Sequence, residues 1–527
     1  MTERKFKAPL FEALRKYKAR KDASFHVPGH KDGQAYPCMK QNDDTLTGVM
    51  EIDTTEITGT DDLHHPEGVI REAQELAADL FGAEETFFLV GGSTAGNLAL
   101  ILSVCTTPGD VLLVQRNVHK SVIHGFMLAN ANAVFLEPQQ DASSGLMTIP
   151  SEETVRKALH RYPDAKGLLV TSPNYYGMGA SLFPLAKLCH ANGVPLLVDE
   201  AHGAHYGLHP DLPKSALEAG ADGVVQSTHK MLTAMTMGAM LHVQGNLLNV
   251  NVIRQRLAMV QSSSPSYPIM ASLDLSRGMI QSQGSDFFTE GLALVEQLIE
   301  GIGDLQRIHF LKPGASGDND AYSIQDPFKF VLYDEEGQWS GYKLQVTLEA
   351  EGCIPEMSDD HYVVLALSSA TSQGDIVRLL NALRKIDHLM QVSTWNIENK
   401  EDIYDDTQKG LDIEVEAEID LDQGNSRYAE AVSDKVHFDL RIVAAEEIES
   451  VRVEECEGRQ AAEMIIPYPP GIPILYPGEP ISARTANQLV RLKYAGAKCQ
   501  GTADPTLTTI QVHRIGTAQD GQRQGLL

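Results

Sequence analysis

Apolar and polar positions follow helix and strand patterns in turn from about residue 68 to residue 243. Residues 68–82, GVIREAQELAADLFG, repeat their apolar side chains at helical spacing, which predicts an amphipathic helix. Five short apolar runs have the length of strands: VLLV (111–114), AVFL (133–136), GLLVTS (167–172), VPLLVDEAHG (194–203) and GVVQSTHK (223–230). Apolar strands that alternate with helices predict an α/β fold with a mostly parallel sheet, whose strand ends share one ligand-binding edge.

The pattern changes after about residue 285. Residues 286–310 predict a helix, and FKFVLY and HYVVLALSS predict strands of a smaller unit that ends with the helix IVRLLNALRKI. From Asn396 the chain becomes acidic, which is typical of a solvated linker or surface. We therefore predict an N-terminal arm (1–60), a large α/β domain (61–285), a small α/β domain (286–395), a C-terminal α+β domain (396–500) and a loosely held polar tail (501–527).

Composition and charge narrow the classes of function. The chain is 43% hydrophobic and 22% charged, which is ordinary for a globular protein and unlike a disordered one. Its formal net charge is −28, from 43 basic and 71 acidic residues. A nucleic-acid partner is not expected, because a phosphate backbone requires a basic surface. The acidic surface is compatible with small cationic substrates, although it is more often a solubility feature.

The six cysteines are scattered along the chain, without a C-x-x-C pair or the spacing of a zinc site. Such isolated thiols favour a reducing compartment. The first residues, MTERKFKAPLFEALRKY, lack the apolar core of a signal peptide, and no run of about 18 apolar residues predicts a membrane span. We expect a cytoplasmic protein with no membrane partner.

Three polar clusters fall at predicted strand or loop ends. The first is LVGGSTAGNLALILSV (89–104), in which glycines and hydroxyl residues, including Ser93 and Thr94, precede an apolar helix. Such a turn exposes backbone N–H groups at a helix N-terminus and is a natural seat for a phosphate. Gly-Ser-Thr turns also merely cap helices, so the motif is ambiguous when taken alone.

The second cluster is LLVDEAHGAHYG (196–207), where Asp199 directly follows an apolar strand. A carboxylate in that position is costly unless a cation meets it, although it could also cap the next helix. His202 and His205 raise the question of a metal, but no further ligands with suitable spacing accompany them. The letters DEAH are shared with helicases, and the phosphate-binding loop that a helicase needs is absent.

The third cluster is STHK (227–230), which places Lys230 after an apolar run without an acidic neighbour. A lysine hidden from water has a lowered pKa and becomes a nucleophile that forms a Schiff base with an aldehyde. Alternatively, the side chain could extend past a buried strand to solvent. Pyridoxal 5'-phosphate (PLP) accounts for all three clusters together, because it needs a phosphate turn, a carboxylate at its pyridine nitrogen and a lysine at its aldehyde.

These residues carry a family resemblance. The chain resembles the Orn/Lys/Arg decarboxylases of fold type I, in their shorter bacterial branch without an N-terminal wing domain. The motifs that carry the resemblance are FHVPGHKDG (25–33), TGTDDLHHPEGVIREAQ (58–74), RNVHKS (116–121), VDEAHGAH (198–205), QSTHK (226–230), SSSPSYPIMASLD (262–274) and IPYPPGIPILYPGE (466–479). The resemblance extends from about residue 8 to residue 500 and is weakest across 396–450.

The resemblance implies a role for individual residues. Lys230 would join the cofactor's aldehyde, Asp199 would pair with its pyridine nitrogen, and His119 would stack on its ring. The phosphate would be held by Ser93, Thr94 and the backbone of Ala95, with Ser227 and His229 close by, and His202 would lie beside the ring. Ser263 would reach the phosphate of a neighbouring subunit, so the site would lie at the subunit interface of a homodimer or higher homo-oligomer. Larger relatives have a Thr-rich phosphate turn, where this chain has Ala95 and Gly96.

The resemblance implies decarboxylation of arginine, lysine or ornithine to the corresponding amine and CO₂, as in polyamine biosynthesis. The sequence does not decide among these three substrates, and arginine or lysine is slightly favoured. Two alternatives stay open: another fold-type-I PLP enzyme, such as an aminotransferase or a β-eliminase, and a non-catalytic relative. An aminotransferase would need an arginine for the α-carboxylate, and the sequence offers no convincing one. The Pro-rich YPPGIP segment and Glu479 are expected near the entrance of the site, and FHVPGHK and DDLHHP along its walls.

Overall fold

The structure is a computed structural model that describes residues 5–36, 46–313, 321–398, 431–468, 471–494 and 496–514 of the 527-residue chain. The described residues form two compact units. The first lies within the ranges 1–287, 314–325 and 432–527, and the second within 288–313 and 326–431. The N-terminal and C-terminal segments therefore belong to the same unit as the large sheet. The five domain ranges expected from the sequence stay a prediction.

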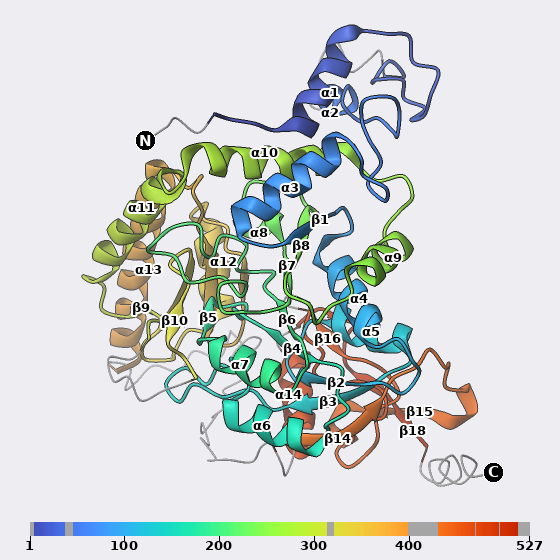
Figure 1. Cartoon of the computed structure of the whole chain (residues 1–527). Helices are drawn as coiled ribbons and strands as arrows, with labels where there is room; N and C mark the ends of the chain where they lie inside the picture. Colours follow the sequence, from blue (N-terminus) through green and yellow to red (C-terminus); the bar gives the residue numbers. More distant parts are fainter. Residues whose placement is uncertain are drawn as a thin grey trace, which may run out of the picture. The chain divides into compact units, whose positions relative to one another are not determined.

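An eight-stranded sheet forms the centre of the first unit (Figure 1). Its strands, in spatial order, are β1 (Glu85–Leu89), β8 (Ala239–Val243), β7 (Gly223–Gln226), β6 (Leu196–Asp199), β4 (Leu168–Thr171), β2 (Val111–Gln115), β3 (Asn132–Leu136) and β14 (Val432–His437). The five neighbouring strands from β7 to β3 run parallel. They coincide with the five apolar runs, so the expected α/β fold with a mostly parallel sheet is confirmed. The sequence analysis missed β1 and the antiparallel β8.

Helices of this unit include α1 (Pro9–Arg20), α2 (Thr47–Met50), α3 (Val69–Phe81), α4 (Gly92–Val104), α5 (Lys120–Ala129), α6 (Glu152–Arg161), α7 (Phe183–Ala191), α8 (Thr228–Met231), α9 (Val250–Val260) and α10 (Tyr267–Gln283). Most of these helices lie alongside the sheet, whereas α1 and α2 lie beyond α10 and α3 (Figure 1). The amphipathic helix expected over 68–82 is α3. Helix α4 packs against β1, β8, β7 and β6, and its neighbours α5 and α9 pack on it. No helix of the described residues is long and apolar enough to cross a membrane.

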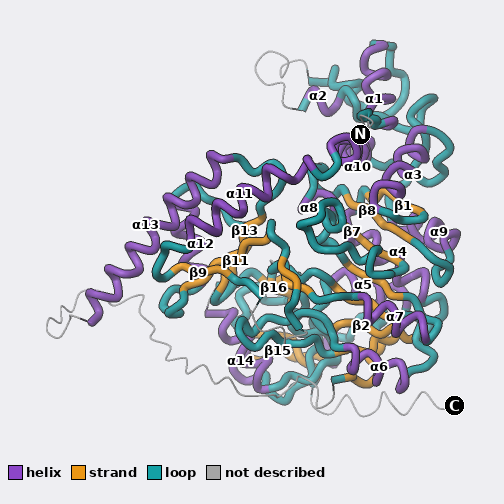
Figure 2. The backbone as a smooth tube through the Cα atoms, turned by 60° about the vertical axis from the view of Figure 1, so that its left-hand side comes forward, coloured by secondary structure: helices purple, strands orange, loops and turns teal. Residues whose placement is uncertain are grey.

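The N-terminal helix α1 is fastened to α10 by a buried carboxylate. Asp274 accepts hydrogen bonds from the backbone N–H groups of Leu10 (2.9 Å) and Phe11 (3.2 Å), and it forms a buried ion pair with Arg277. The carboxylate therefore satisfies two of the donors that a helix start leaves unpaired. Figure 2 shows α1 beside α10 and α3.

The C-terminal segment adds an edge strand and a small core to the first unit. Strand β14 pairs antiparallel with β3, so residues about 300 positions apart lie side by side (Figure 1). The remaining elements are β5 (Met178–Gly179), β10 (Ile324–Gln325), β15 (Ile448–Arg452), β16 (Ile466–Pro467), α14 (Ala483–Tyr494), β17 (Cys499–Gln500) and β18 (Thr509–His513). The acidic residues 399–430 lie outside the described residues.

The expectation of a loosely held tail from Gly501 is wrong for the described part of that segment. Strand β18 pairs with β15 along five residue pairs, and Leu507, Ile510 and Val512 are buried in the C-terminal core. Ile510 and Val512 are separated by one residue, which is the period of a strand with one buried face. That short alternation is hidden among polar neighbours. Residues 515–527 lie outside the described part.

The second unit is a smaller α/β layer. Its antiparallel sheet has the order β12 (Met357–Ser358), β13 (Tyr362–Ala366), β11 (Lys329–Asp334) and β9 (Ile308–Phe310). Its helices are α11 (Asp286–Ile302), α12 (Gly341–Ala350) and α13 (Gln373–Glu398). The two strands expected from FKFVLY and HYVVLALSS are confirmed. The helix expected over 286–310 ends at Ile302, because Gly303 follows it and the chain then enters β9.

A chain of buried polar side chains crosses strands β1, β8 and β7 and ends at Glu200, directly after β6. Thr86 contacts Nδ1 of His242 (2.8 Å), whose Nε2 lies 3.1 Å from Oε1 of Gln226. Gln226 donates to Oε2 of Glu200 (2.7 Å), and the backbone N–H of Ala216 donates to Oε1. Burial lowers the pKa of His242 to about 3 and raises the pKa of Glu200 to about 8. These contacts fit a neutral His242 imidazole that donates a hydrogen bond from Nε2 to Gln226.

Replacing Gln226 by leucine is expected to destabilise the cofactor-free protein. The change leaves buried groups of both Glu200 and His242 without a partner, at a cost of about 1–3 kcal/mol for each group. Denaturant unfolding measures the loss. The exposed Gln306→Leu is the matched control and should change stability by less than about 0.5 kcal/mol. Equal denaturant midpoints of unfolding for Gln226→Leu and Gln306→Leu would show that the chain of buried polar side chains does not stabilise the fold.

Candidate functional site

Lys230 lies in the short helix α8, which begins just after β7 ends. Its Nζ is 2.9 Å from Nε2 of His202, a buried residue that follows the neighbouring strand β6. The ring of Tyr175 also faces this amine, 5.7 Å from Nζ. The expectation of a lysine hidden from solvent is wrong for the described chain, where the Lys230 side chain is exposed. The helical turn carries the side chain beyond the buried strand, so the amine is accessible to a ligand.

Asp199 is the last residue of β6 and only 3% exposed. Its Oδ2 accepts a hydrogen bond from Nδ2 of Asn97 (2.8 Å), and its Oδ1 accepts one from the backbone N–H of Ala201 (3.1 Å). Burial raises the pKa of Asp199, whereas the Asn97 bond, the nearby charge of Lys230 and the Ala201 bond act in the opposite direction. A buried carboxylate of this kind is expected to bind a cationic or proton-donating partner.

The predicted phosphate turn forms the N-terminus of α4, as expected. Helix α4 begins at Gly92, so the backbone N–H groups of Ser93, Thr94 and Ala95 have no carbonyl partner within the helix. The hydroxyl of Ser93 lies 2.7 Å from the hydroxyl of Ser227, which follows β7. Thr94 is exposed and Ala95 is buried. Helix N–H groups and hydroxyls that meet in this way form a suitable anion-binding site.

Gly96 lies where α4 packs tightly against the sheet. A Cβ atom added at Gly96 would lie 2.8 Å from Cγ1 of Val225 and 2.9 Å from Cδ1 of Leu89. The missing side chain therefore lets α4 approach β7 and β1 closely. That approach brings the start of α4 and the next residue, Asn97, to the sheet edge that carries Asp199.

His229 and Ser263 are the two other residues predicted near the cofactor's phosphate. His229 has Nδ1 3.0 Å from the backbone oxygen of Gly238, so this nitrogen is engaged with the main chain. Ser263 is exposed in the loop between α9 and α10. Within the described part of the chain, no hydrogen bond joins Ser263 to the residues around Lys230.

His119 is the N-cap residue of α5. Its Nδ1 accepts a hydrogen bond from the backbone N–H of Ser121 (3.2 Å) and lies 2.8 Å from the Ser121 hydroxyl. Burial lowers the pKa of His119 to about 4, and the charges of Lys230, Lys120 and His124 act in the same direction. The imidazole is therefore neutral at physiological pH.

The Pro-rich C-terminal segment reaches His119. The backbone oxygen of Gly471 accepts from the N–H of Lys120 (3.0 Å), and a Cβ added at Gly471 would lie 3.1 Å from Nε2 and Cδ2 of His119. Gly471 also has φ +93°, a backbone conformation that L side chains rarely adopt. This segment therefore packs against the candidate ring-stacking residue. Residues 469–470 lie outside the described part.

Glu479 has a structural partner rather than an open position at an entrance. Both of its carboxylate oxygens accept from Nη2 of Arg116 at 2.9 Å, and both side chains are largely buried. The Arg116 guanidinium lies 4.7 Å from the ring of Tyr476 and 5.3 Å from that of Phe135. The pair holds the C-terminal segment against the end of β2.

The motif DDLHHP also has a structural role. The carboxylate of Asp61 accepts from the backbone N–H groups of Gly68 (2.8 Å) and Ile70 (2.9 Å), at the start of α3. The hydroxyl of Tyr267 donates to the backbone oxygen of Asp61 at 2.5 Å. These contacts cap a helix and fasten the loop to α10, so they do not require a substrate.

The sequence analysis did not select Asn97, Ser121 or Tyr175. Asn97 lies inside the quoted phosphate motif, and Ser121 ends the quoted motif RNVHKS. Tyr175 follows β4, and its ring lies 4.6 Å from that of His202. Burial raises the pKa of Tyr175, and the charge of Asp199 adds to the effect. The turn SPNYYG directly after an apolar strand was the signal that could have identified Tyr175.

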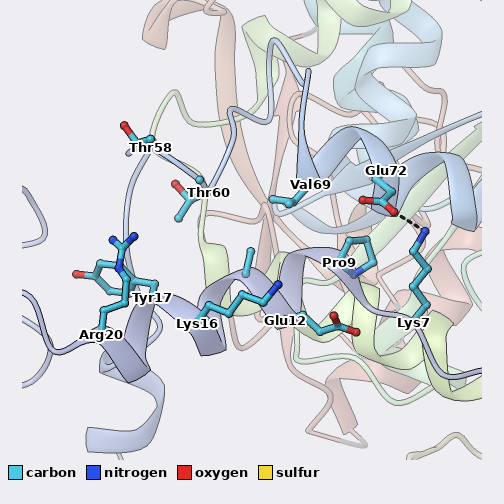
Figure 3. A pocket seen from close by; sticks show the side chains of 12 residues that line it. Lys7, Pro9, Glu12, Lys16, Tyr17, Arg20, Thr58, Thr60, Val69 and Glu72 are labelled. Carbon is cyan, nitrogen blue, oxygen red and sulfur yellow. Dashed lines mark ion pairs between the residues drawn. The ribbon is translucent and has the colours of Figure 1, made fainter.

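A separate hollow of about 400 Å³ lies between α1, α3 and the loop at 58–60 (Figure 3). Three basic and two acidic side chains line it, and one pair, Lys7 and Glu72, forms an ion pair. The hollow shares no residue with the cluster around Lys230, and its mixed charge favours no ligand class. No group of three or more His, Cys, Asp or Glu side chains is placed to hold a metal among the residues that the structure describes.

Comparison with known protein families identifies the family of this chain. A profile of the Orn/Lys/Arg decarboxylase major domain matches residues 8–375, and a profile of the C-terminal domain of the same family matches residues 433–501. The chain belongs to the Orn/Lys/Arg decarboxylase family. Members of this family are PLP-dependent carboxy-lyases that act on amino acids, so the expected enzyme class and fold type are confirmed.

Named relatives extend over almost the whole chain. It is 40% identical to the uncharacterized protein YaaO of Bacillus subtilis, over 94% of this chain and 96% of that one. It is 34% identical to an arginine decarboxylase of Bacillus anthracis, over 96% and 97% of the two chains. Among solved structures, it is similar to the lysine decarboxylase LdcF of Francisella novicida, with a TM-score of 0.75 and 19% identity over 97% of this chain and 81% of that one. At 19% identity, the similarity to LdcF shows a shared fold alone.

The described residues of this decarboxylase-family chain fit PLP. The cofactor has an anionic phosphate, a basic pyridine nitrogen and an aldehyde. The start of α4 supplies N–H groups and hydroxyls, Asp199 supplies a buried carboxylate, and Lys230 supplies an accessible amine. Burial raises the pKa of Asp199, because an ionised carboxylate is costly in a site without water. A protonated pyridine nitrogen would supply a cationic partner.

Proposed function

We propose that the chain catalyses the PLP-dependent decarboxylation of arginine, lysine or ornithine to the corresponding amine and CO₂. The observation that carries the proposal is the placement of a buried carboxylate, Asp199, and an accessible amine, Lys230, after neighbouring parallel strands. The membership of the family supports the reaction class. The relatives named arginine decarboxylases, at 33–34% identity over at least 90% of the chain, favour arginine among the three substrates.

The proposed mechanism divides the work between the cofactor and the protein. When bound, PLP supplies a conjugated ring that takes up the electron pair left when the bond to the carboxylate breaks. Asp199 would keep a proton on the pyridine nitrogen, and the protein excludes water around this carboxylate. Neutral His119, held by Ser121 and closed in by Gly471, would offer an uncharged ring face to the cofactor. Ser93, Ser227 and the start of α4 would hold the phosphate.

His202 is placed to exchange a proton with Lys230. Its Nε2 is 2.9 Å from Nζ, so the amine can be held neutral for attack by passing a proton to the imidazole. The same pair can return a proton to the α-carbon of the substrate after CO₂ has left. Tyr175 limits the movement of both groups, because its ring faces the amine and lies against His202.

The proposal includes a cytoplasmic homodimer with a small-molecule substrate and neither a nucleic-acid nor a membrane partner. Ser263 is exposed, and the resemblance assigns it to a neighbouring subunit's phosphate. A second copy of the chain would therefore complete the phosphate site. Sedimentation of the purified protein tests this part separately from the chemistry.

A direct assay tests the proposed reaction. The purified protein is loaded with PLP and incubated separately with L-arginine, L-lysine and L-ornithine, with L-glutamate as an amino acid of opposite side-chain charge. We expect equimolar CO₂ and amine from at least one basic substrate and none from L-glutamate. Conversion of the substrates to keto acids without CO₂ would favour an aminotransferase. No product from any of them, with PLP bound, would contradict the proposal.

A further inference from the structure

Asn97 connects two groups of the site that lie on different elements. It lies on α4 and is 1% exposed. Its Nδ2 donates one hydrogen bond to Oδ2 of Asp199 (2.8 Å) and another to the hydroxyl of Ser121 (3.0 Å). The Ser121 hydroxyl lies 2.8 Å from Nδ1 of His119. A continuous chain therefore joins Asp199 at the end of β6 to His119 at the start of α5.

The direction of each hydrogen bond in this chain follows from one backbone group. The N–H of Ser121 donates to Nδ1 of His119, so Nδ1 carries no proton. The Ser121 hydroxyl must then donate to the same nitrogen, and its oxygen is left to accept from Asn97. An amide nitrogen has two hydrogens, one for Ser121 and one for Asp199. The arrangement requires Asp199 as an acceptor and a neutral His119 with its proton on Nε2.

The surroundings hold Asn97 in this position. Gly96 lets α4 lie against β7, where a Cβ atom would meet Val225. The charged groups that act on His119 are Lys230, Lys120 and His124, all cationic when protonated, so they also favour its neutral form. Gly471 covers the Nε2 edge of the ring and adds no charge.

The groups that face Asp199 are few. Lys230 favours the ionised carboxylate, as do the hydrogen bonds from Asn97 and Ala201. The Tyr175 phenol is close enough to interact electrostatically with Asp199, and it stays neutral, because burial raises a pKa that already lies above physiological pH. Asn97 is therefore the uncharged side chain that both favours an ionised Asp199 and reaches His119.

We propose that Asn97 is a positioning residue, which keeps Asp199 an acceptor and, through the Ser121 hydroxyl, fixes the orientation of His119 and adds a second hydrogen bond to its Nδ1. This inference rests on the proposed function, because it assigns Asp199 and His119 to the two sides of one bound ring. A single amide would thereby link the carboxylate that pairs with the ring nitrogen to the histidine on which the ring stacks. The side chain acts through its neighbours and need not touch the substrate.

Three variants test the proposal in the cofactor-free protein. Asn97→Leu preserves the approximate size and removes both hydrogen bonds, Ser121→Ala breaks only the outer link, and Ser103→Ala is the control on the same helix. The Ser103 hydroxyl donates to the backbone oxygen of Ala99, away from the chain. Nitrogen-15 NMR of labelled histidines, with His119 assigned by His119→Gln, reports the protonation and hydrogen bonding of each ring nitrogen. The backbone N–H of Ser121 is present in every variant, so we expect the proton to stay on Nε2. We expect Asn97→Leu and Ser121→Ala to shift the Nδ1 resonance, because the hydroxyl hydrogen bond is misaligned or lost, and Ser103→Ala to leave it unchanged.

Assays of the PLP-loaded enzyme distinguish the effect on Asp199 from the effect on His119, the two ends of the hydrogen-bond chain. We expect Asn97→Leu to lower kcat at least about tenfold, because Asp199 loses a hydrogen bond to its charged form. The pH dependence of the bound cofactor's absorbance should shift in Asn97→Leu and stay as in the original protein in Ser121→Ala. The conservative variant Asn97→Gln should recover part of the absorbance behaviour if its longer amide still reaches Asp199.

Two results would overturn the proposal. One is an unchanged His119 Nδ1 resonance in both Asn97→Leu and Ser121→Ala. The other is an absorbance profile of Asn97→Leu that matches that of Ser103→Ala. If Asn97→Leu does not fold, Ser121→Ala still tests the link to His119. Failure of the original protein to decarboxylate any basic amino acid would count against the proposed function, whereas the NMR result tests the hydrogen-bond chain independently.

Discussion

Replacing Lys230 by alanine is expected to reduce amine and CO₂ release by at least about 10³-fold, a size typical of removing the nucleophile of a covalent mechanism. The amine lies 2.9 Å from His202 and is accessible from solvent, so no rearrangement of the chain is needed for it to react. The neighbouring Lys120 cannot easily substitute, because it contacts the ring of Tyr468 and donates to Gln500. Steady-state assays of both products measure the loss.

Lys214→Ala is the matched control for this variant. Lys214 is an exposed lysine of the same unit, outside the site, and its removal should leave both products at the level of the original protein. Both variants should unfold at similar denaturant concentrations. A Lys230→Ala enzyme that turned over normally would show that another group reacts with the cofactor.

Replacing Asp199 by asparagine is expected to lower kcat by roughly a hundredfold to a thousandfold, the effect of removing one preorganised electrostatic contact in an active site. Asparagine has nearly the same shape, but it cannot hold a positive charge at a ring nitrogen. The exposed Asp211→Asn is the control and should retain full activity. Assays at saturating PLP distinguish this effect from weaker cofactor binding.

The same substitution should change how stability depends on pH. The pKa of Asp199 is higher in the folded chain than its ordinary value of 3.8. The folded state therefore loses stability relative to the unfolded state as the pH rises from that value toward the folded pKa. Cofactor-free Asp199→Asn should lose less stability than the original protein as the pH rises above that ordinary value. Equal slopes in denaturant unfolding, together with an unchanged kcat, would contradict the role given to Asp199.

Much of the fold could be predicted because its central strands are apolar throughout. A run such as LLVD is costly to expose, so it predicts a strand covered on both faces, and the residue at its end faces the ligand edge. This reasoning located Asp199 and the start of α4 correctly. It also placed Lys230 after the correct strand, but it could not foresee that a helical turn carries the amine into solvent.

The missed parts depend on contacts between distant positions. Asn97 and Asp199 are 102 residues apart and Asn97 and Ser121 are 24 apart, so no periodicity joins them. Strand β18 is missed because only two of its five side chains are buried. The contact of Gly471 with His119 needs a tertiary fold that brings the C-terminal segment to α5. A local sequence pattern carries no information about contacts between such distant positions.

The most direct test is to identify the residue that becomes covalently attached to PLP. The loaded protein is reduced with borohydride, digested and analysed by mass spectrometry. The account predicts the pyridoxyl-phosphate adduct on the peptide that contains Lys230, and no adduct at that position in Lys230→Ala. An adduct on another lysine, or none on protein that has bound PLP, would contradict it.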